Sequence, residues 1–263
     1  MEIKKVGILG AGVMGAQIAA HLTNAKIPVY AFDMSQDVAE KGVEAALKIK
    51  PAAFYNPKDA EIITPLNYDD HLDKLKECDW IIEVIAEKIE WKHVLYERIS
   101  SHVNPNSIIT SNTSGLAATA LVEKMDISLK KRFFITHFFN PPRYMKLVEI
   151  ITHADTDQSL IGPMADFLEN VLGKGVVYAK DTPNFVANRI GVFGMMATLE
   201  EAYKRNLSIE DVDALTGTLI GRPKSATFRT ADVVGLDTLS FVANTAYKNC
   251  LDDEERDGFK LPD

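Results

Sequence analysis

The two side chains that best fit proton-transfer chemistry are His137 and Glu149, a histidine and a carboxylate twelve residues apart. His137 stands near the end of the apolar run Arg132–Phe138, and Glu149 lies within a second run, Leu147–Ile151. A turn at Asn140–Arg143 would lay the two runs side by side and bring both side chains within hydrogen-bonding reach. A neutral imidazole is a good general base near neutral pH, and a carboxylate on its other nitrogen fixes the tautomer and stabilises the charged form. The alternative is a buried histidine with a structural role only.

A glycine loop follows the strand-like run Val6–Leu9 and fits the pattern G-x-G-x-x-G with Gly10, Ala11, Gly12, Val13, Met14 and Gly15. In a dinucleotide-binding turn the first glycine permits the tight bend, the second lets a pyrophosphate approach the backbone, and the third lets the helix pack on the strand. The helix that begins here offers free N–H groups and a positive dipole end to phosphates. The alternative is a glycine-rich turn without a ligand.

Asp33 ends the next strand-like run, Val29–Phe32, and comes 18 residues after Gly15. A carboxylate at this place accepts hydrogen bonds from the ribose hydroxyls of a dinucleotide, and its charge repels a 2′-phosphate. Together with the loop, Asp33 therefore favours NAD over NADP as the cofactor.

Two further polar groups follow later strand-like runs. Glu87 and Lys92 lie just past Trp80–Ala86, where a cofactor would be within reach, because ligands of doubly wound sheets sit outside the carboxyl ends of the strands. The start of a solvated helix explains these two residues equally well. Polar residues 111–114, Ser-Asn-Thr-Ser, end the next run and suit a site for a nicotinamide and a substrate carbonyl; a plain turn that caps the following helix is the alternative.

Short apolar runs alternate with helical patterns as far as Asp181-Thr182-Pro183, and only helical patterns follow. This order predicts an α/β fold, namely a Rossmann-type doubly wound and mostly parallel sheet, followed by an all-helical C-terminal domain. We expect an NAD-binding domain over residues 1–181 and a helical substrate and dimerisation domain over 182–263. The proline-bearing stretch Pro51–Pro65 is expected to be an excursion from the sheet, and helices are expected over residues 117–125, 185–205, 209–219 and 237–250.

The composition excludes several classes of protein. The 263 residues carry a net charge of −8, which argues against non-specific binding to nucleic acid. No apolar run approaches the roughly 18 residues of a membrane span, and we do not expect the first residues to be a signal peptide, because they lead straight into a strand pattern. Two cysteines make no disulfide framework and favour a reducing cytoplasm. No histidines or cysteines have the spacing of metal ligands, so no metal site is expected.

Several motifs taken together resemble the L-3-hydroxyacyl-CoA dehydrogenases. They are the glycine loop with Asp33, Glu87 with Lys92, Asn-Thr-Ser at 112–114, His-Phe-Phe-Asn-Pro at 137–141, Lys-Leu-Val-Glu at 146–149 and Asp-Thr-Pro-Asn-Phe-Val-Ala-Asn-Arg at 181–189. The resemblance extends from residue 3 to the end of the chain. It implies oxidation of the 3-hydroxyl of an acyl-CoA by NAD, a step of fatty-acid β-oxidation.

The resemblance also implies a role for each matching position. His137 would be the general base that takes the hydroxyl proton, and Glu149 would orient it and balance its charge. Ser114 and Asn188 would hydrogen-bond the reacting oxygen or the thioester carbonyl, and Asn112 would lie by the nicotinamide ribose.

The sequence departs from the stand-alone enzymes in two ways. Residues 51–65 are short and proline-bearing and, like residues 221–228, resemble fused enzymes that also carry an enoyl-CoA hydratase-like domain. The sequence also stops at Asp263, where family members usually continue with another helix. We therefore expect a truncated piece of a bifunctional protein, and a homodimer because residues 190–199 are apolar nearly all round; a central core helix is the equal alternative. Two other functions stay open: an idle NAD-binding relative with a structural or sensing role, and a dehydrogenase of free β-hydroxy acids. The latter usually relies on a lysine where this chain offers Asn188.

Overall fold

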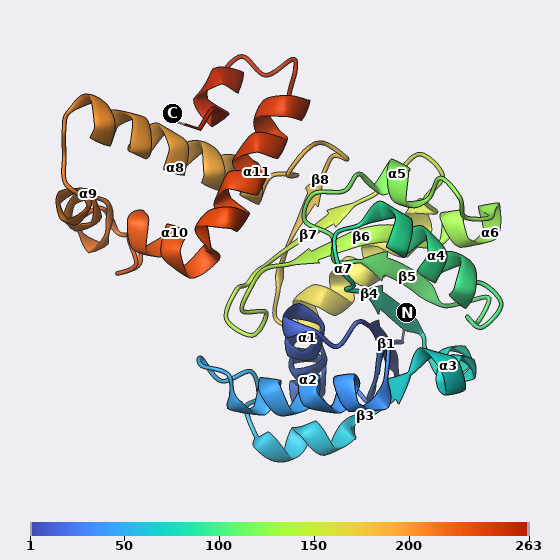
Figure 1. Ribbon diagram of the computed structural model, residues 1–263. Coiled ribbons are helices and arrows are strands. Elements are labelled where there is room, and N and C mark those ends of the chain that lie inside the picture. The colour runs from blue at the N-terminus through green and yellow to red at the C-terminus, as the bar shows by residue number, and fades with distance from the viewer. Residues whose placement is uncertain (1, 262–263) are drawn as a thin grey trace. The chain divides into compact units, whose positions relative to one another are not determined.

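The computed structural model describes residues 2–261 and divides into two compact units, the first ending at Asp181 and the second beginning at Thr182. The first unit is an α/β structure and the second consists of helices (Figure 1). This is the fold class that the alternation of strand and helix patterns predicted.

The first unit is built on one sheet of eight strands in the order β3-β2-β1-β4-β5-β6-β7-β8. The strands are β1 (Val6–Leu9), β2 (Val29–Asp33), β3 (Ile63–Asn67), β4 (Trp80–Glu83), β5 (Ile108–Ser111), β6 (Phe133–Phe138), β7 (Leu147–Ile151) and β8 (Gly175–Ala179). Neighbouring strands are parallel except β6 and β7, which form an antiparallel pair. The sheet is thus mostly parallel, as predicted.

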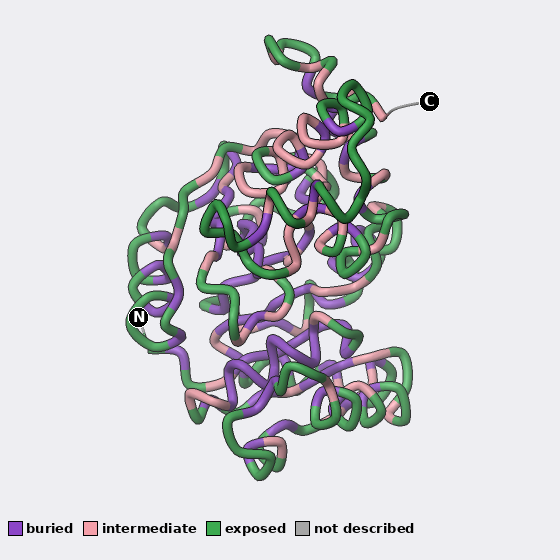
Figure 2. The backbone as a smooth tube through the Cα atoms, turned by 90° about the vertical axis from the view of Figure 1, so that its left-hand side faces the viewer, coloured by how far each residue is buried: buried purple, intermediate pink, exposed green. Residues whose placement is uncertain are grey.

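Helices cover both faces of the sheet, which is why the central strands are continuous apolar runs rather than alternating ones. The helices of this unit are α1 (Val13–Asn24), α2 (Gln36–Lys48), α3 (Tyr68–His71), α4 (Ile89–Ile99), α5 (Ala118–Leu121), α6 (Ile127–Lys131) and α7 (Ile161–Asn170), with 3-10 turns η1 (Pro57–Ile62), η2 (Leu72–Glu77) and η3 (Gln158–Leu160). Every residue of β1, β4, β5 and β6 is buried, and Figure 2 shows the buried stretches of the chain in purple.

Adjacent residues of β6 show which helices lie on which face, because successive side chains of a strand point to opposite sides. Phe134 belongs to the buried cluster formed with α1, α2 and α7. Phe133 meets Tyr96 of α4 edge-on, with 5.5 Å between ring centroids. One face is therefore covered by α1, α2 and α7, and the opposite face by α4.

The strand register places several polar residues on the face that α4 covers. Glu83 pairs with Ser111, and Ser111 pairs with Ile135 across β4, β5 and β6. His137 pairs with Glu149 across β6 and β7. Because His137 is two residues beyond Ile135, it lies on the same face, one step closer to the carboxyl end of its strand.

One prediction about this unit is wrong at its edge. The expected excursion Pro51–Pro65 ends inside the sheet, since Ile63–Asn67 forms β3 and pairs with β2 in parallel. Pro65 has no N–H to donate, but β3 is an edge strand with one neighbour, where proline is tolerated. The apolar Ile63 and Leu66 are buried there. The helix expected over 117–125 is also shorter, because only Ala118–Leu121 is α-helical.

The second unit contains α8 (Ala187–Lys204), α9 (Ile209–Thr216), α10 (Phe228–Val234) and α11 (Leu236–Asn249), with η4 (Thr218–Ile220) and η5 (Arg256–Phe259). Its core joins Met196 of α8 to Ala243 and Ala246 of α11 and to Phe259 of η5. No helix was predicted over α10, which is separated from α11 by Gly235 with a positive φ of 96°. Within residues 2–261 no helix is long and apolar enough to cross a membrane.

Candidate active site

The glycine loop joins β1 to α1, and each glycine has a separate reason to lack a side chain. Gly10 has a φ of +105°, and a Cβ there would lie 2.8 Å from the carbonyl oxygen of Val84. A Cβ on Gly15 would lie 1.8 Å from the carbonyl oxygen of Gly10. Around Gly12, in contrast, an added Cβ would meet nothing within 4 Å. The fold itself requires Gly10 and Gly15, whereas the space beside Gly12 is open, as a pyrophosphate-binding turn requires.

The N-terminus of α1 is also prepared for an anion. Its N-cap is Gly12, which has no side chain to accept hydrogen bonds from the first turn. The first amides of the helix, from Val13 onward, therefore lack a side-chain cap, and Val13 itself is exposed. The residues of the loop fit the pyrophosphate of a dinucleotide.

Asp33 lies at the carboxyl end of β2, beside this loop. Its Oδ2 accepts a hydrogen bond from the N–H of Ala11 at 2.8 Å, and its Oδ1 accepts one from the N–H of Met34 at 2.7 Å. A carboxylate has about four acceptor sites, so both oxygens retain capacity for ribose hydroxyls. The hydrogen bond from Ala11 thus fixes the Asp33 carboxylate beside the glycine loop.

A buried ion pair lies at the carboxyl end of β4. Lys92 of α4 donates to Glu83 Oε1 at 2.6 Å and to the carbonyl oxygen of Ile85 at 3.3 Å. The Lys92 side chain is 1% exposed and that of Glu83 is 0% exposed. The alternative of a solvated helix start is therefore wrong for Lys92. A carboxylate in a buried strand, nine residues before a lysine, was the available signal for this pair, but the sequence alone assigned Glu83 no role.

Glu87 holds the turn that follows β5. Its carboxylate accepts from Thr113 Oγ1 at 2.8 and 2.9 Å, from the N–H of Ser114 at 2.6 Å and from Ser114 Oγ at 3.2 Å. Lys92 Nζ is 3.6 Å from Glu87 Oε2. The two residues predicted beyond β4 and the polar residues predicted beyond β5 therefore form one connected group.

Asn112 connects this turn to the strand that carries His137. Its Oδ1 accepts a hydrogen bond from the N–H of Phe138 at 2.8 Å, and its own N–H donates to the carbonyl oxygen of Glu83 at 2.8 Å. Asn112 thus spans the carboxyl ends of β4, β5 and β6, and its amide is used for this structural purpose.

The predicted histidine–carboxylate pair is formed. His137 Nδ1 lies 2.8 Å from Glu149 Oε2, and the two residues are direct partners in the antiparallel register of β6 and β7. His137 is 4% exposed and Glu149 is 0% exposed. The ring of Phe139 lies 4.4 Å from the imidazole, centroid to centroid. Hydrogen bonding to a carboxylate through Nδ1 assigns the proton there and leaves Nε2 as the basic nitrogen.

Two buried side chains that the sequence did not reveal hold the connection between β6 and β7. Gln17 of α1 donates to Asn140 Oδ1 at 3.1 Å. Lys174 donates to the carbonyl oxygens of Pro142 and Met145. Burial lowers the pKa of Lys174 to about 8. Neither contact could be predicted from neighbouring residues, because Gln17 and Lys174 are both distant in sequence from the residues that they contact.

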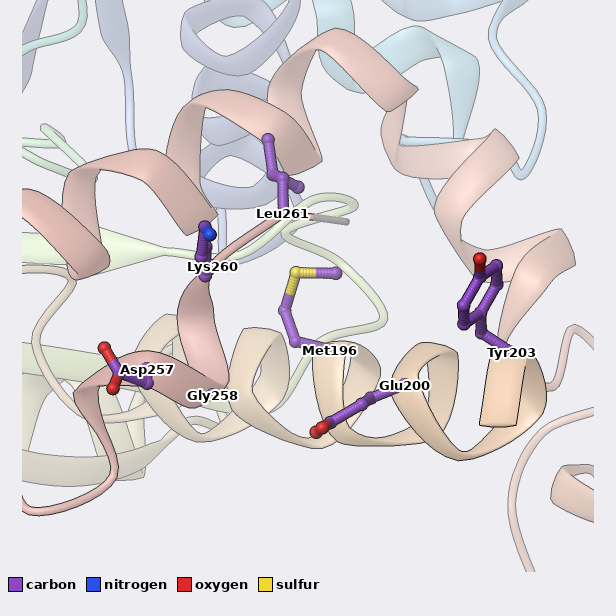
Figure 3. A pocket seen from close by; sticks show the side chains of 7 residues that line it. All are labelled: Met196, Glu200, Tyr203, Asp257, Gly258, Lys260 and Leu261. Carbon is purple, nitrogen blue, oxygen red and sulfur yellow. The ribbon is translucent and has the colours of Figure 1, made fainter. Parts of the chain in front are cut away.

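Asn188 lies in the first turn of α8, in the second unit, and is half-buried. Its neighbour Arg189 forms an ion pair with Asp253. The second unit also has a cavity of about 230 Å³, lined by Met196, Glu200, Tyr203, Asp257, Gly258, Lys260 and Leu261 (Figure 3). None of the predicted site residues lines it. No group of three or more potential metal ligands occurs among the described residues.

Known proteins match this chain over nearly its whole length. Residues 5–182 match the 3-hydroxyacyl-CoA dehydrogenase NAD binding domain, and residues 185–260 match the C-terminal domain of the same family. A probable 3-hydroxyacyl-CoA dehydrogenase of Bacillus subtilis is 45% identical over 282 residues, covering 99% of this chain and 36% of the relative. One of Deinococcus radiodurans is 45% identical over 262 residues, covering 97% of this chain and 76% of the relative.

The crystal structure of (S)-3-hydroxybutyryl-CoA dehydrogenase PaaH1 from Ralstonia eutropha matches with a TM-score of 0.81 at 28% identity, over 98% of this chain and 90% of that one. The chain spans about a third of the Bacillus relative and about three quarters of the Deinococcus relative. Both family domains are matched in order and nearly end to end. The chain therefore belongs to the 3-hydroxyacyl-CoA dehydrogenase family, and its first unit is that family's NAD-binding domain.

Proposed function

We propose that this chain catalyses the NAD-dependent oxidation of L-3-hydroxyacyl-CoA to 3-ketoacyl-CoA and the reverse reaction. The observation that carries the proposal is the contact of 2.8 Å between His137 Nδ1 and Glu149 Oε2 at the end of the buried β6–β7 pair. The family supports the substrate class. The name of the Ralstonia structure supports a short acyl chain such as 3-hydroxybutyryl-CoA.

In this proposal His137 moves the proton. With Nδ1–H directed at Glu149, Nε2 accepts the proton of the substrate 3-hydroxyl. Glu149 then stabilises the resulting imidazolium, because a buried positive charge is costly without a partner. The bound NAD supplies the chemistry of hydride acceptance from C3, so the protein contributes orientation and electrostatics.

The other site residues bind and orient. Ser114 is proposed to hydrogen-bond the reacting oxygen, and its orientation is set by Glu87, which accepts from its N–H at 2.6 Å. Asn188 keeps the role that the family resemblance gives it, a hydrogen bond to the reacting oxygen or the thioester carbonyl. Asn112 is proposed to lie by the nicotinamide ribose.

The cofactor residues follow from the loop and the strand ends. Gly10, Gly12, Val13, Met14 and Gly15 are proposed to surround the pyrophosphate, with Gly12 providing the open space.

Asp33 is proposed to bind the adenosine ribose and to disfavour NADP by charge. Glu87 and Lys92 are proposed to belong to the cofactor site, Lys92 from a fully buried position.

We also propose that the chain forms a homodimer and belongs to a larger, fused protein. Fusion to an enoyl-CoA hydratase-like domain is consistent with the 36% of the Bacillus relative that this chain covers. A homodimer and the proposed division into a cofactor domain and a substrate and dimerisation domain follow from the sequence patterns. Both cysteines are free and buried, which suits a reducing compartment such as the cytoplasm.

The test is the loss of NADH absorbance when the purified chain receives NADH and acetoacetyl-CoA, with free acetoacetate as the control. We expect turnover with the CoA thioester and little with the free acid. Equal or faster turnover of the free acid contradicts the proposal in favour of a β-hydroxy-acid dehydrogenase. Tight NADH binding without turnover of either compound contradicts it in favour of an idle relative.

A further inference from the structure

Glu83 is a completely enclosed charged side chain near the candidate site. It is 0% exposed, and each of its carboxylate oxygens accepts two hydrogen bonds. Oε1 accepts from Lys92 Nζ at 2.6 Å and from the N–H of Ile85 at 2.7 Å. Oε2 accepts from Tyr96 Oη at 2.7 Å and from Ser111 Oγ at 2.6 Å. All the acceptor sites of this carboxylate are used inside the protein, so none is left for a ligand.

Stability alone does not account for this arrangement. A buried ion pair is commonly no more stabilising than well-packed apolar side chains of the same volume, because both charges must leave water. The neighbouring residues of β4, Trp80, Ile81 and Ile82, are apolar and equally buried. An apolar residue at position 83 would continue this core, so the carboxylate and its lysine point to a purpose other than holding the sheet together.

Two chains of contacts lead from Glu83 to the same turn. The first passes through Lys92, whose Nζ is 3.6 Å from Glu87, to the N–H of Ser114, which donates to Glu87 at 2.6 Å. The second passes through Ser111, whose Oγ accepts from the N–H of Thr113 at 3.2 Å. Both routes therefore end at residues 113 and 114.

The same turn is tied to the strand of the general base. The backbone carbonyl of Glu83 accepts from the N–H of Asn112, and Asn112 Oδ1 accepts from the N–H of Phe138, next to His137. On the face covered by α4, Glu83 and Ser111 lie in one row across the sheet, and His137 lies one same-face step beyond it.

We propose that Glu83 is a positioning residue, which fixes Glu87 and the Ser111–Ser114 turn at the correct place relative to His137 through Lys92 and Ser111. This inference rests on the proposed dehydrogenase function. It also assigns Lys92 a role through Glu87, rather than through direct contact with substrate. A displacement of about 1 Å in such supporting residues can reduce a rate by about 10²-fold, although they touch no reacting atom.

The first variant is Glu83→Gln, which keeps the shape of the side chain and removes its charge. Its amide nitrogen cannot accept hydrogen bonds, so it meets a donor where the carboxylate offered an acceptor, and Lys92 loses the negative charge that pairs with it. We expect kcat for acetoacetyl-CoA reduction to fall by about 10²-fold, with a lower unfolding midpoint. The matched control is Asp73→Asn, which removes the carboxylate of an exposed lysine pair of the same 2.6 Å length, Lys76–Asp73, and should leave kcat unchanged.

The decisive variant is the double substitution Glu83→Gln/Lys92→Met, which removes both charges of the pair. If the pair only stabilised the fold, the double variant would recover both the unfolding midpoint and kcat. We expect recovery of the midpoint while kcat stays about 10²-fold below the wild type, because Glu87 still lacks its lysine. A double variant with wild-type midpoint and wild-type kcat overturns the proposal.

A third variant serves if both of these fail to fold. Ser111→Ala leaves the Lys92–Glu83 pair intact and breaks only the second route, so kcat should fall by about tenfold, and the midpoint should fall no further than for Tyr96→Phe, which also removes one hydrogen bond to Glu83. An unchanged kcat overturns the proposal. Titration of NADH fluorescence separates the two hypotheses. A wild-type chain that binds NADH but does not reduce acetoacetyl-CoA contradicts the proposed function. A folded double variant that binds NADH and turns over like the wild type contradicts only the role of Glu83.

Discussion

The site contains two buried pairs of a base and a carboxylate, and they differ in what their base can do. His137–Glu149 joins an imidazole to a carboxylate at 2.8 Å, and Lys92–Glu83 joins an ammonium to a carboxylate at 2.6 Å. Both carboxylates are completely buried. In the proposed reaction the imidazole takes up and releases a proton, whereas Lys92 only donates hydrogen bonds, to Glu83 and to the carbonyl oxygen of Ile85.

The difference shows how similar contacts serve different purposes. A pair whose charge must change during turnover needs a base of intermediate strength and a partner that tolerates both of its states. A pair whose charge is constant can have every hydrogen bond satisfied, as around Glu83, and so hold its surroundings rigidly. Substituting each pair should therefore change different quantities, the rate in one case and the stability together with the rate in the other.

The largest effect is expected when Glu149 becomes glutamine. A carboxamide that donates to Nδ1 stabilises the wrong tautomer, and it cannot balance an imidazolium. We expect kcat with acetoacetyl-CoA to fall by about 10²–10⁴-fold, while NADH affinity stays within about twofold. Steady-state kinetics with a fluorescence titration of NADH measures both. A kcat within about threefold of the wild type would mean that the two pairs do not differ in their effect on the rate.

A large loss of stability is expected for Lys92→Met, which leaves the Glu83 carboxylate buried without its cation. The free energy of unfolding should decrease by about 3–5 kcal/mol, as measured by urea titration. Lys76→Met is the control, because its partner Asp73 is exposed and ion pairs between exposed side chains add little to stability. Equal losses in both variants are incompatible with an enclosed charge at Glu83.

His21 sharpens the comparison, because it is a buried histidine bonded to a backbone carbonyl instead of a carboxylate. Its Nε2 lies 3.1 Å from the carbonyl oxygen of Leu172. Burial, followed by the charge of Lys174 and to a smaller extent that of Arg143, lowers the pKa of His21 from 6.5 to about 4. In the unfolded chain His21 takes up a proton that the folded chain does not, so its contribution to stability is full above pH 6.5, decreases as the pH falls from 6.5 to about 4, and changes no further below that.

The measurement is the pH dependence of the free energy of unfolding for the wild type and for His21→Gln, whose amide can still donate to Leu172. We expect the wild type to lose about 3 kcal/mol more than the variant over this acid range. Parallel curves for the two proteins would contradict the pKa of His21 on which the comparison depends.

The smallest effect is expected for Tyr96→Phe, which removes one of the four donors to Glu83. Burial, and then the charge of Glu83, raise the pKa of Tyr96 well above its usual value, so the phenol remains a neutral donor. Losing a hydrogen bond to a charged group should reduce stability by about 1.5–3 kcal/mol, read from the shift of the urea midpoint. A loss as large as that of Lys92→Met would mean that the cation is not the main partner.

The comparison also shows which parts of the site the sequence can reveal. His137 and Glu149 lie on neighbouring strands with one connection between them, so a turn at residues 140–143 was enough to predict that they would come within hydrogen-bonding reach. The glycine loop is equally local, because its glycines follow a strand and open a helix. Both features were predictable from residues within about a dozen positions of each other.

Other features depend on the assembled sheet. Glu83 meets Ser111 only because β4 and β5 are neighbours in the sheet. Asn112 meets Phe138 only because β5 and β6 are neighbours as well. Proline made residues 51–65 resemble an excursion, yet an edge strand accepts Pro65. The roles of Ser114, Asn112 and Asn188 came from family resemblance, since their residue types alone fit an ordinary turn or helix start.

The most direct measurement of the central claim compares His137→Gln with the wild type in two assays, turnover of acetoacetyl-CoA with NADH and equilibrium binding of NADH. If His137 is a general base that touches the substrate and does not hold the cofactor, kcat should fall by about 10²–10⁴-fold. The NADH dissociation constant should then stay within about twofold of the wild type. Wild-type turnover by the folded variant would contradict the assignment of His137 as the base.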